Sequence, residues 1–340
     1  MTTSSRPSIA IIIVSWNAGD WLRTCIESLR GACADTFTLS DTIVVDNGST
    51  DNSLTGIDAL GVPVRLIRNS DNLGFAAACN QAAWNTSSDY LLFLNPDTKL
   101  FKNSFSVPIA VMEQPSNQTV GICGIRLIDK FGDVNRHCAR FPTPLSLAIT
   151  STGLDKIMPS AGLGYFMTEW DHLSTQVVDH VIGAFYLVRR KVFDELHGFD
   201  QTFFVYLEDL DFSFRARARG WLSLYLADAC AFHAGGGTSR QVKAERLFYS
   251  LRSRLLYAFK HFSALGAWLV FATTLVLEPV TRTIFALARG AWADVGHTAR
   301  GYRMLLGHLP SVLRVARGSV RSSSAARRPD GKAPRAGDRR

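Results

Sequence analysis

The first hundred residues alternate between short apolar runs and longer stretches in which apolar side chains recur every three or four positions. A continuous β-branched run is typical of a strand buried on both faces, and the 3–4 spacing is typical of a helix. Helical spacing follows Gly19 and Gly74, and residues 49–51 have the composition of a helix cap. The pattern predicts parallel strands, with helices on both faces of the sheet, at residues 9–14, 42–45, 64–67 and 90–94.

The second half of the chain is less regular. Apolar runs predict strands at residues 181–188 and 222–226, and helical spacing predicts helices at 207–219 and 241–260. Residues 128–180 contain several prolines and glycines without a clear period. We interpret them as an insertion or as a loop that faces a second substrate.

Polar residues follow three of the predicted parallel strands where each strand ends. In open α/β sheets a ligand binds outside the carboxyl ends of the strands. The shared placement therefore predicts one binding edge, which carries Ser15 and Asn17, then Asp46 and Asn47, and finally Asn95 and Asp97.

Two of these carboxylates suggest a chemistry. Asp46 can accept hydrogen bonds from a nucleobase or ribose, although an aspartate at a strand end also forms ordinary Asx turns. Asp97 offers an oxygen ligand for a divalent cation, although Asn-Pro-Asp is also common in turns. His233 precedes a run of glycines and would by itself be read as structural. In one cavity with Asp97 it would be a second metal ligand.

Glu208, Asp209 and Asp211 place three carboxylates within four residues at the start of a predicted helix. Acidic residues near a helix N-terminus are favourable for structural reasons alone. Three carboxylates this close also repel one another, which shifts their pKa values and is typical of groups that accept a proton in catalysis. We interpret them as a catalytic cluster.

The composition, 47% hydrophobic and 19% charged over 340 residues, provides a packed core for one large domain or two smaller ones. The net charge of +8 arises at the C-terminal end, where residues 282–340 hold 13 basic and 3 acidic side chains. Such an end suits an anionic membrane surface or nucleic acid, or is simply solvated. Residues 321–340 are predicted to be disordered.

An uncharged stretch of 16 residues at 262–277 precedes Glu278 and Pro279. As a helix it reaches about 24 Å, short of the roughly 30 Å core of a bilayer. Three interpretations stay open: a strained transmembrane helix, an interfacial helix or re-entrant hairpin broken at Pro279, and a buried or oligomer-contact helix. The arginines that follow favour a membrane surface.

Taken together, these segments resemble family 2 of the inverting glycosyltransferases, most closely its bacterial rhamnosyltransferase-like branch. Each segment is weakly diagnostic alone, and their order and spacing carry the resemblance. They are residues 13–17, 44–51, 72–76 with Asn80, 94–97, 183–185 and, most strongly, 198–211 through to Arg215.

The resemblance implies a GT-A fold with one Rossmann-like mixed sheet, in which Asp46 binds the nucleotide base and Asp97 and His233 hold Mg²⁺ or Mn²⁺ on the donor's diphosphate. Asp209 matches the base that deprotonates the acceptor in a single inverting displacement, with Glu208 and Asp211 beside it. The rest of the nucleotide-sugar site would comprise Ser15, Asn17, Asn47, Gly74, Asn80 and Asn95.

Two departures from the family pattern matter. The commoner metal motif is Asp-x-Asp, whereas Asn95 stands at the first position here, so the ion would bind weakly without the donor's phosphates. The Gln-x-x-Arg-Trp motif of processive synthases does not occur in the sequence, which favours transfer of a single sugar.

Other classes fit less well. Residues 15–20 provide neither the Gly-x-Gly-x-x-Gly of a dehydrogenase nor the Gly-rich basic loop of a sugar nucleotidyltransferase. A non-catalytic sugar-nucleotide-binding protein would keep the fold without the candidate base.

The sequence thus predicts a glycosyltransferase domain at 1–240, with a nucleotide-binding half at 1–100 and an acceptor and catalytic half at 101–240. A helical membrane-associating region would follow at 241–320 and a basic tail at 321–340. The expected partners are a nucleotide-sugar donor, with dTDP-rhamnose favoured by resemblance, a saccharide or lipid-linked acceptor, and an anionic membrane but no nucleic acid. We expect a role in cell-surface polysaccharide synthesis on the cytoplasmic side of the inner membrane.

Overall fold

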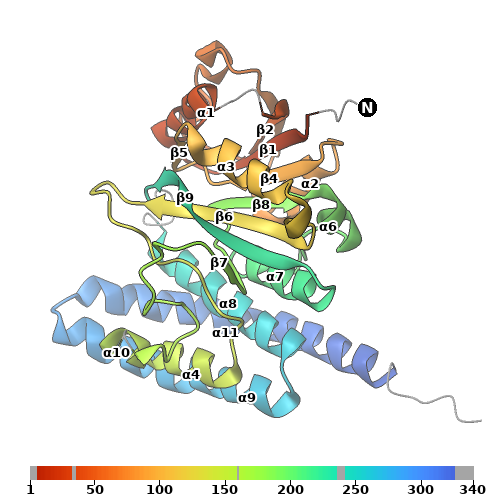
Figure 1. Cartoon of the computed structure of the whole chain (residues 1–340). Coiled ribbons are helices and arrows are strands. Elements are labelled where there is room, and N and C mark those ends of the chain that lie inside the picture. The colour runs from red at the N-terminus through yellow and green to blue at the C-terminus, as the bar shows by residue number, and fades with distance from the viewer. Residues whose placement is uncertain (1–5, 33–35, 159–160, 236–241, 326–340) are drawn as a thin grey trace, which may run out of the picture.

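A mixed β-sheet forms the centre of the computed structural model, which describes residues 6–32, 36–158, 161–235 and 242–325 (Figure 1). Within those residues the strands are β1 (Ser8–Ser15), β2 (Thr38–Asp46), β3 (Arg65–Arg68), β4 (Tyr90–Leu94), β5 (Thr98–Leu100), β6 (Val120–Ile128), β7 (Gln176–Val178), β8 (Phe185–Arg189) and β9 (Leu222–His233). Their order is β3-β2-β1-β4-β8-β6-β9-β5, with β7 paired to β9. The first four in that order are parallel, and β8 runs antiparallel to β4.

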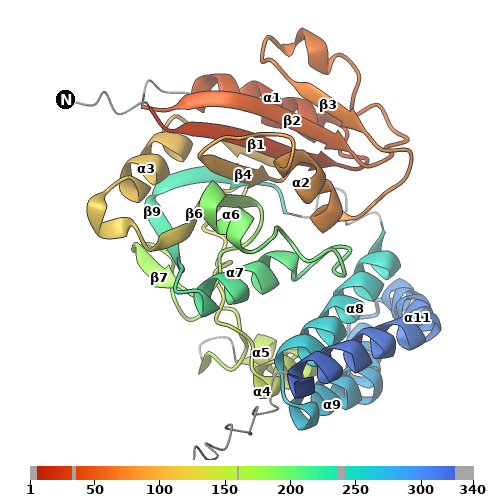
Figure 2. The same ribbon diagram turned by 90° about the vertical axis from the view of Figure 1, so that its right-hand side faces the viewer.

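Helices cover both faces of the sheet, as Figure 2 shows from the side. The odd-numbered residues 9–13 of β1 pack in one hydrophobic cluster with α1 (Asp20–Ala32) and α3 (Asn103–Met112). The even-numbered residues 10–14 pack in a second cluster with α2 (Phe75–Ala83), α6 (Arg190–Glu195) and α7 (Glu208–Ala218). Because both faces are covered, the strand is apolar without alternation, which confirms the predicted α/β class.

A layer of helices lies below the sheet in Figure 1. It consists of α4 (Pro144–Thr152), α5 (Leu154–Ile157), α8 (Lys243–His261), α9 (Ala264–Ala272), α10 (Glu278–Ala288) and α11 (Trp292–Ala325). Its hydrophobic core includes Phe203 and Leu210, which belong to the segment around the start of α7. The helical layer and the segment that leads into α7 therefore share one packed interface.

The expected helix after residues 49–51 does not form. Ser49 Oγ accepts a hydrogen bond from the Asn17 amide, and the Thr50 amide donates to Asn17 Oδ1. These groups join two strand ends and are not available to cap a helix, so the only helical turn in this segment, among the described residues, is a 3₁₀ turn at Ile57–Leu60.

Several boundaries differ from the sequence-based expectation. The strand expected at 181–188 begins at Phe185. The one expected at 222–226 continues to His233, because β6 pairs with it again and β5 also pairs with it after a bulge at residues 227–229. The segment 128–180 is not wholly irregular, since it contains α4, α5 and β7. Pro144 stands in the first turn of α4 behind a capping box of Thr143 and Ser146, which is a start signal and not a break.

Pro279 does not break the chain into a hairpin. Helical structure runs from Ala264 through Ala288, with a π turn at Thr273–Leu277 directly before Pro279. The widened turn relieves the clash that a proline ring makes with the carbonyl four residues earlier in an α-helix. Helix α11 likewise runs to Ala325, and the residues from 326 to 340 of the predicted disordered tail lie outside the described part of the chain.

Candidate active site

The carboxyl ends of β1 and β2 bring the first predicted site residues together. Ser15 and Asp46 are partners in the parallel register, and both are buried. Asn17 has a left-handed backbone (φ 50°), and its Oδ1 accepts hydrogen bonds from the Thr50 amide at 2.8 Å and the Asp51 amide at 3.3 Å. Asn17 thus fixes the loop after β2.

Asp46 keeps part of its carboxylate available. Its Oδ1 accepts from the Ser49 amide at 3.2 Å, and no hydrogen bond from the described residues reaches its Oδ2. The Ser15 hydroxyl is buried and has no partner among the described residues. These two groups suit hydrogen bonds with a ligand that enters at the strand ends.

Three of the residues predicted to bind the nucleotide sugar instead contact other segments of the protein. Asn47 donates to the Gly74 carbonyl at 3.1 Å. A Cβ atom at Gly74, whose φ is +85°, would lie 2.4 Å from the Phe204 carbonyl oxygen, so only glycine allows this approach. Asn80 is buried, and its amide exchanges two hydrogen bonds with the Phe199 backbone. The geometry favours positioning roles for these residues.

Asp97 and His233 face each other. Pairing of β5 with β9 sets Thr98 opposite His233. His233 Nε2 lies 3.2 Å from Asp97 Oδ1 and 3.5 Å from the side-chain nitrogen Nδ2 of Asn95. Both side chains are about 11% exposed, enough for a small ligand to reach them. No group of three or more metal-ligating side chains occurs among the described residues. A cation here would have two protein ligands and would need substrate oxygens to complete its shell.

The start of α7 lies at the same edge of the sheet. β8 runs antiparallel to β4, so the residues before β8 meet the end of β4, and the Asn95 amide donates to the Ala184 carbonyl at 3.0 Å. The Gly183 amide donates to Asp209 Oδ2 at 2.7 Å. A Cβ atom at Gly183 would lie 2.9 Å from that oxygen, so a side chain here would displace the Asp209 carboxylate.

The backbone before α7 is strained. Tyr206 and Leu207 both have left-handed conformations, with φ of 69° and 65°. Non-glycine residues in this region cost free energy and persist where surrounding contacts hold them, commonly at functional sites. Here the two residues orient Glu208 and Asp209 at the first turn of α7.

Glu208 is buried, and its Oε2 has no hydrogen-bond partner among the described residues. Burial, together with the neighbouring charge of Asp209, raises the pKa of the Glu208 carboxyl well above its usual value. The shifted pKa expected for this cluster therefore occurs at Glu208, which favours the protonated form.

Asp211 has a different environment. It is fully buried and contacts Arg215 Nε at 2.7 Å, Lys260 Nζ at 2.6 Å and His261 Nε2 at 2.7 Å. Burial alone would raise its pKa, but these three partners bring the pKa down to about 2. Asp211 joins α7 to α8 and has no access to a substrate, so the geometry does not support the catalytic role expected from sequence.

The sequence pattern missed His180. Its Nε2 lies 3.6 Å from Asp209 Oδ2, and its Nδ1 lies 3.0 Å from the Ser213 hydroxyl. Burial lowers the pKa of His180, so the imidazole is neutral beside Asp209. The only local signal was a histidine in the apolar run before Gly183.

A cavity of about 620 Å³ extends from this edge into the 128–168 segment. His233 and Ile182 line one part, and Asp155 and Gly164 line another. Both ring nitrogens of His137, a further lining residue, are buried without a partner among the described residues. The cavity reaches His233 and also Ile182, the chain neighbour of Gly183, whose amide holds Asp209.

Comparison with known proteins shows the family of the chain. Residues 10–197 match the sequence profile of the protein family described as Glycosyl transferase family 2. N-acetylglucosaminyl-diphospho-decaprenol L-rhamnosyltransferase of Mycobacterium tuberculosis is 25% identical over 238 residues, which are 66% of this chain and 75% of that protein. Rhamnosyltransferase WbbL of Escherichia coli is 26% identical over 258 residues, which are 73% of this chain and 92% of that protein.

Solved structures share the fold at low sequence identity. A mannosyltransferase from Pyrobaculum calidifontis, in complex with GDP-Man and Mn²⁺, superposes with a TM-score of 0.52 at 14% identity over 96% of this chain and 89% of that chain. GalNAc-T7 with UDP, GalNAc and Mn²⁺ also gives 0.52, at 16% identity over 75% of this chain and 51% of that chain. The predicted GT-A-like fold is confirmed. The family model covers more than half of the residues of this chain. The chain therefore belongs to glycosyl transferase family 2 and is a glycosyltransferase.

Proposed function

We propose that this enzyme transfers one sugar, with inversion, from a nucleotide-diphosphate donor to a saccharide or lipid-linked saccharide in cell-surface polysaccharide synthesis. L-rhamnose is the transferred sugar suggested by the relatives' names, and dTDP-rhamnose is the donor suggested by the resemblance of the sequence motifs. The observation that carries the proposal is Asp209, a partly accessible carboxylate held by the Gly183 amide at the edge that also presents Asp97 and His233.

On the donor side, Asp46 Oδ2 and the Ser15 hydroxyl would bind the base or ribose, and Asn17 and Asn47 hold the loops around them. Asp97 and His233 would hold Mg²⁺ or Mn²⁺ together with the diphosphate, with Asn95 beside them. An oxygen ligand and an imidazole fit either ion, and two protein ligands fit an ion that arrives with its substrate. When bound, the cation would neutralise charge on the leaving diphosphate.

On the acceptor side, Asp209 would take the proton of the attacking hydroxyl. The Gly183 amide fixes one carboxylate oxygen, and neutral His180 orients the group without neutralising it. Protonated Glu208 keeps a second negative charge away from Asp209. These contacts favour an enzyme over a non-catalytic sugar-nucleotide-binding protein, which has no need for a positioned base.

The first test uses metal dependence. A catalytic cation contributes several kcal/mol to the transition state, so Asp97→Asn or His233→Ala should lower transfer about 10–100-fold at fixed metal concentration. Both variants should need more Mn²⁺ for half-maximal rate. Chelation with EDTA should stop donor hydrolysis and transfer, and Mg²⁺ or Mn²⁺ should restore them.

The assay follows nucleotide release from dTDP-rhamnose and other nucleotide sugars. Asp58→Asn, at an exposed carboxylate in the 3₁₀ turn Ile57–Leu60, is the control. Full activity in chelator would contradict the metal role, and binding of every donor without hydrolysis or transfer would support the non-catalytic alternative.

We further propose that the helical layer lies against the inner surface of the cell membrane. Residues 264–288 form a helix long and apolar enough to cross a bilayer by length and composition. Its inner side carries buried Glu278, paired with Arg254 and Arg282, and packs on α4, α8 and α11. Because α8 and α11 carry many charged side chains, the packing favours an interfacial position over a full span.

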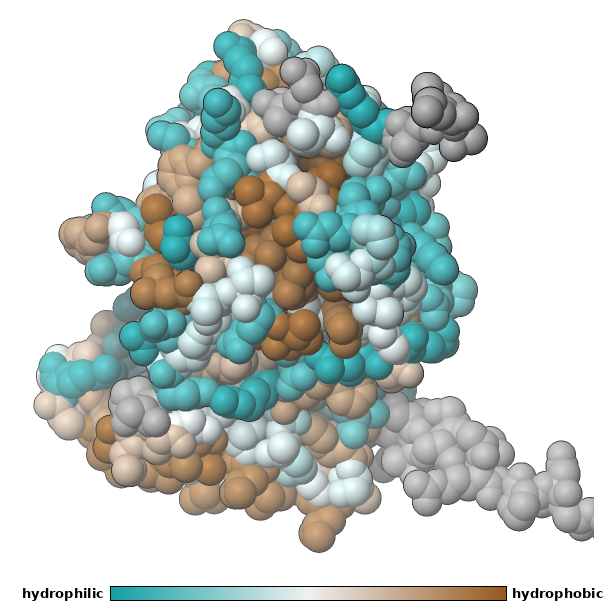
Figure 3. Space-filling model, viewed as in Figure 1, coloured by the Kyte–Doolittle hydropathy of each residue, from teal (hydrophilic) through white to brown (hydrophobic). Residues whose placement is uncertain are grey.

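The outer side of this layer is apolar, as the lower edge of Figure 3 shows. Single exposed apolar residues are ordinary, but a continuous patch is typical of a membrane or protein contact. Arginines of α10 and α11 add attraction to anionic lipids. The exposed apolar side chains include Leu265, Trp268, Leu269, Val276, Leu277, Val280, Ile284 and Leu287.

Flotation with vesicles tests this placement. Changing Leu265, Trp268 and Val276 to serine should weaken binding to phosphatidylglycerol vesicles at least about tenfold, since each buried apolar side chain contributes on the order of 1 kcal/mol or more. Phe131→Ser with Leu173→Ser, at exposed apolar positions in the sheet-containing part, should leave flotation unchanged. Equal flotation of both variants and the wild type would refute the placement.

A further inference from the structure

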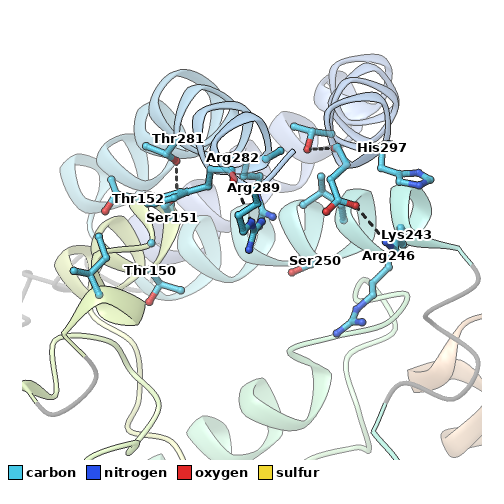
Figure 4. Close-up of a pocket in the computed structure, with 17 residues that line it drawn as sticks. Thr150, Ser151, Thr152, Lys243, Arg246, Ser250, Thr281, Arg282, Arg289 and His297 are labelled. Atoms are coloured by element: carbon cyan, nitrogen blue, oxygen red, sulfur yellow. Dashed lines mark hydrogen bonds and ion pairs between the residues drawn. The ribbon is translucent and has the colours of Figure 1, made fainter. Parts of the chain in front are cut away.

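The helical layer contains a strongly basic pocket of about 710 Å³ between α4, α8, α10 and α11 (Figure 4). Its charged lining consists of Lys243, Arg246, Arg282, Arg289 and the single acid Asp294, with His297 nearby. Asp294 pairs with Lys243 at 3.2 Å, and Arg282 pairs with Glu278 outside the pocket. The pocket therefore keeps an excess of positive charge.

Several polar groups in this pocket lack protein partners. Among the described residues, no side-chain acceptor pairs with the guanidinium groups of Arg246 and Arg289, although Arg289 Nε donates to the Phe285 carbonyl at 3.1 Å. The Thr150 hydroxyl and His297 Nδ1 are shielded from solvent and have no hydrogen bond from the described residues. Two guanidinium groups with a hydroxyl and an imidazole suit a multivalent oxyanion such as a phosphate or diphosphate.

The pocket borders the apolar outer surface of the helical layer. Ile157 and Phe285 line it and are also exposed, with 60% and 41% of their surface accessible. An anion bound here could continue directly into a hydrocarbon chain on the apolar side. A free sugar nucleotide has no hydrocarbon chain and would gain nothing from the apolar surface. A lipid with a phosphorylated head would contact both the basic pocket and the apolar surface.

The pocket also borders the cavity beside the active site. Thr150 and Ile157 line the basic pocket, while Asp155 and Gly164 line the 620 Å³ cavity that reaches His233. A Cβ atom at Gly164 would lie 3.1 Å from Asp155 Cβ and 3.5 Å from the Thr150 hydroxyl oxygen. The segment from α4 to α5 is thus the shared wall of the two spaces.

Helix α8 links the pocket to the catalytic loop on another side. Arg246 and Ser250 line the pocket, while Ser253 Oγ donates to the Val205 carbonyl at 2.8 Å just before the strained residues that precede Glu208. The pocket and the catalytic loop contact the same helix, about 10–12 Å across with its side chains.

We propose that this pocket binds the diphosphate of an isoprenoid-diphosphate-linked acceptor, with the sugar in the adjoining cavity and the hydrocarbon chain on the apolar face of α9 and α10. The inference rests on the proposed function and extends it from an unspecified lipid-linked acceptor to a defined chemical group and its residues. Arg246 and Arg289 are the residues expected to contact the diphosphate.

Calorimetric titration of the full chain tests the pocket, with farnesyl diphosphate as the probe. The double variant Arg246→Gln with Arg289→Gln should raise the Kd about 10–100-fold, because each lost contact is a charge-assisted hydrogen bond. Arg303→Gln removes an equal charge from an exposed position on α11 outside the pocket and should leave the Kd unchanged. If the double variant loses its thermal transition, the two single variants replace it.

Two further arms separate the sources of the phosphate. Inorganic pyrophosphate should bind more weakly than farnesyl diphosphate and show the same dependence on the two arginines. Binding to phosphatidylglycerol vesicles should change no more in the double variant than in Arg303→Gln. An equal Kd for farnesyl diphosphate in all variants, or a loss confined to the vesicles, would overturn the proposal.

Activity on two acceptors separates this proposal from the proposed function. The double variant should raise KM for a diphosphate-linked saccharide about 10–100-fold and leave KM for the same saccharide as a simple glycoside unchanged. If the enzyme transfers sugar but its binding of farnesyl diphosphate does not depend on the two arginines, the proposed diphosphate pocket is refuted and the proposed function is not. Arginine-dependent binding without transfer to any acceptor would refute the proposed function and leave the pocket in place.

Discussion

Replacing Asp209 by asparagine is expected to lower turnover about 10²–10⁴-fold, since the amide keeps the shape of the side chain but cannot accept the acceptor's proton. Donor binding should stay close to wild type, because Asp46, Asp97 and His233 lie on other elements. The Gly183 amide can still donate to the carbonyl oxygen of the introduced side-chain amide, so the fold around α7 should survive. Steady-state rates of sugar transfer, with KM for donor and acceptor, measure the effect.

Glu208→Gln is the matched control for this result. Glu208 is buried and favours its protonated form, so a neutral amide of the same size changes little in its charge. We expect a smaller loss of turnover than for Asp209→Asn. Near wild-type turnover of Asp209→Asn, or a larger loss for Glu208→Gln, would assign the base to another residue.

Replacing Asp211 by alanine is expected to lower the free energy of unfolding by about 3–5 kcal/mol, because it leaves buried cations without their counter-charge. Arg215, Lys260 and His261 all converge on this one carboxylate, which has no exposed surface. Chemical denaturation of the full chain measures the change. Asp194→Ala, which removes an exposed partner of Arg190, should cost no more than about 1 kcal/mol.

The same carboxylate predicts a direction for acid stability. The pKa of Asp211 falls from 3.8 to about 2 on folding, so its stabilising contribution is complete above the ordinary pKa and is lost as pH falls through about 2. The difference in stability between wild type and Asp211→Ala should therefore shrink between pH 4 and pH 2. A difference that stays constant through that range, or a stable Asp211→Ala at neutral pH, would contradict this account of the α7–α8 joint.

The parallel half of the sheet could be predicted from sequence because its signals are local. An unbroken apolar run such as 9–14 and the helical spacing after Gly74 each depend on neighbouring residues only. The binding edge followed from one general rule about strand ends, and the register of Ser15 with Asp46 agrees with it.

The remaining features depend on contacts between residues far apart in sequence. His180 meets Asp209 only because β8 and α7 pack together, and Asp211 is neutralised by Lys260 and His261 on a later helix. Three adjacent acids therefore have three different environments, which their spacing alone could not reveal. The helix continues through Pro279 because of a π turn at Thr273–Leu277, which no residue pattern in the sequence predicted.

The close approaches at Gly74 and Gly183 have a consequence for how substrate selectivity can change in this enzyme. A side chain at either position would collide with the Phe204 carbonyl or the Asp209 carboxylate, so variation there would disturb catalysis whichever sugar is used. Leu163 and Phe166 line the cavity beside His233 and are exposed at the surface. Libraries that seek a new acceptor should therefore randomise these two positions and hold both glycines fixed, and we expect acceptor preference to change more than turnover.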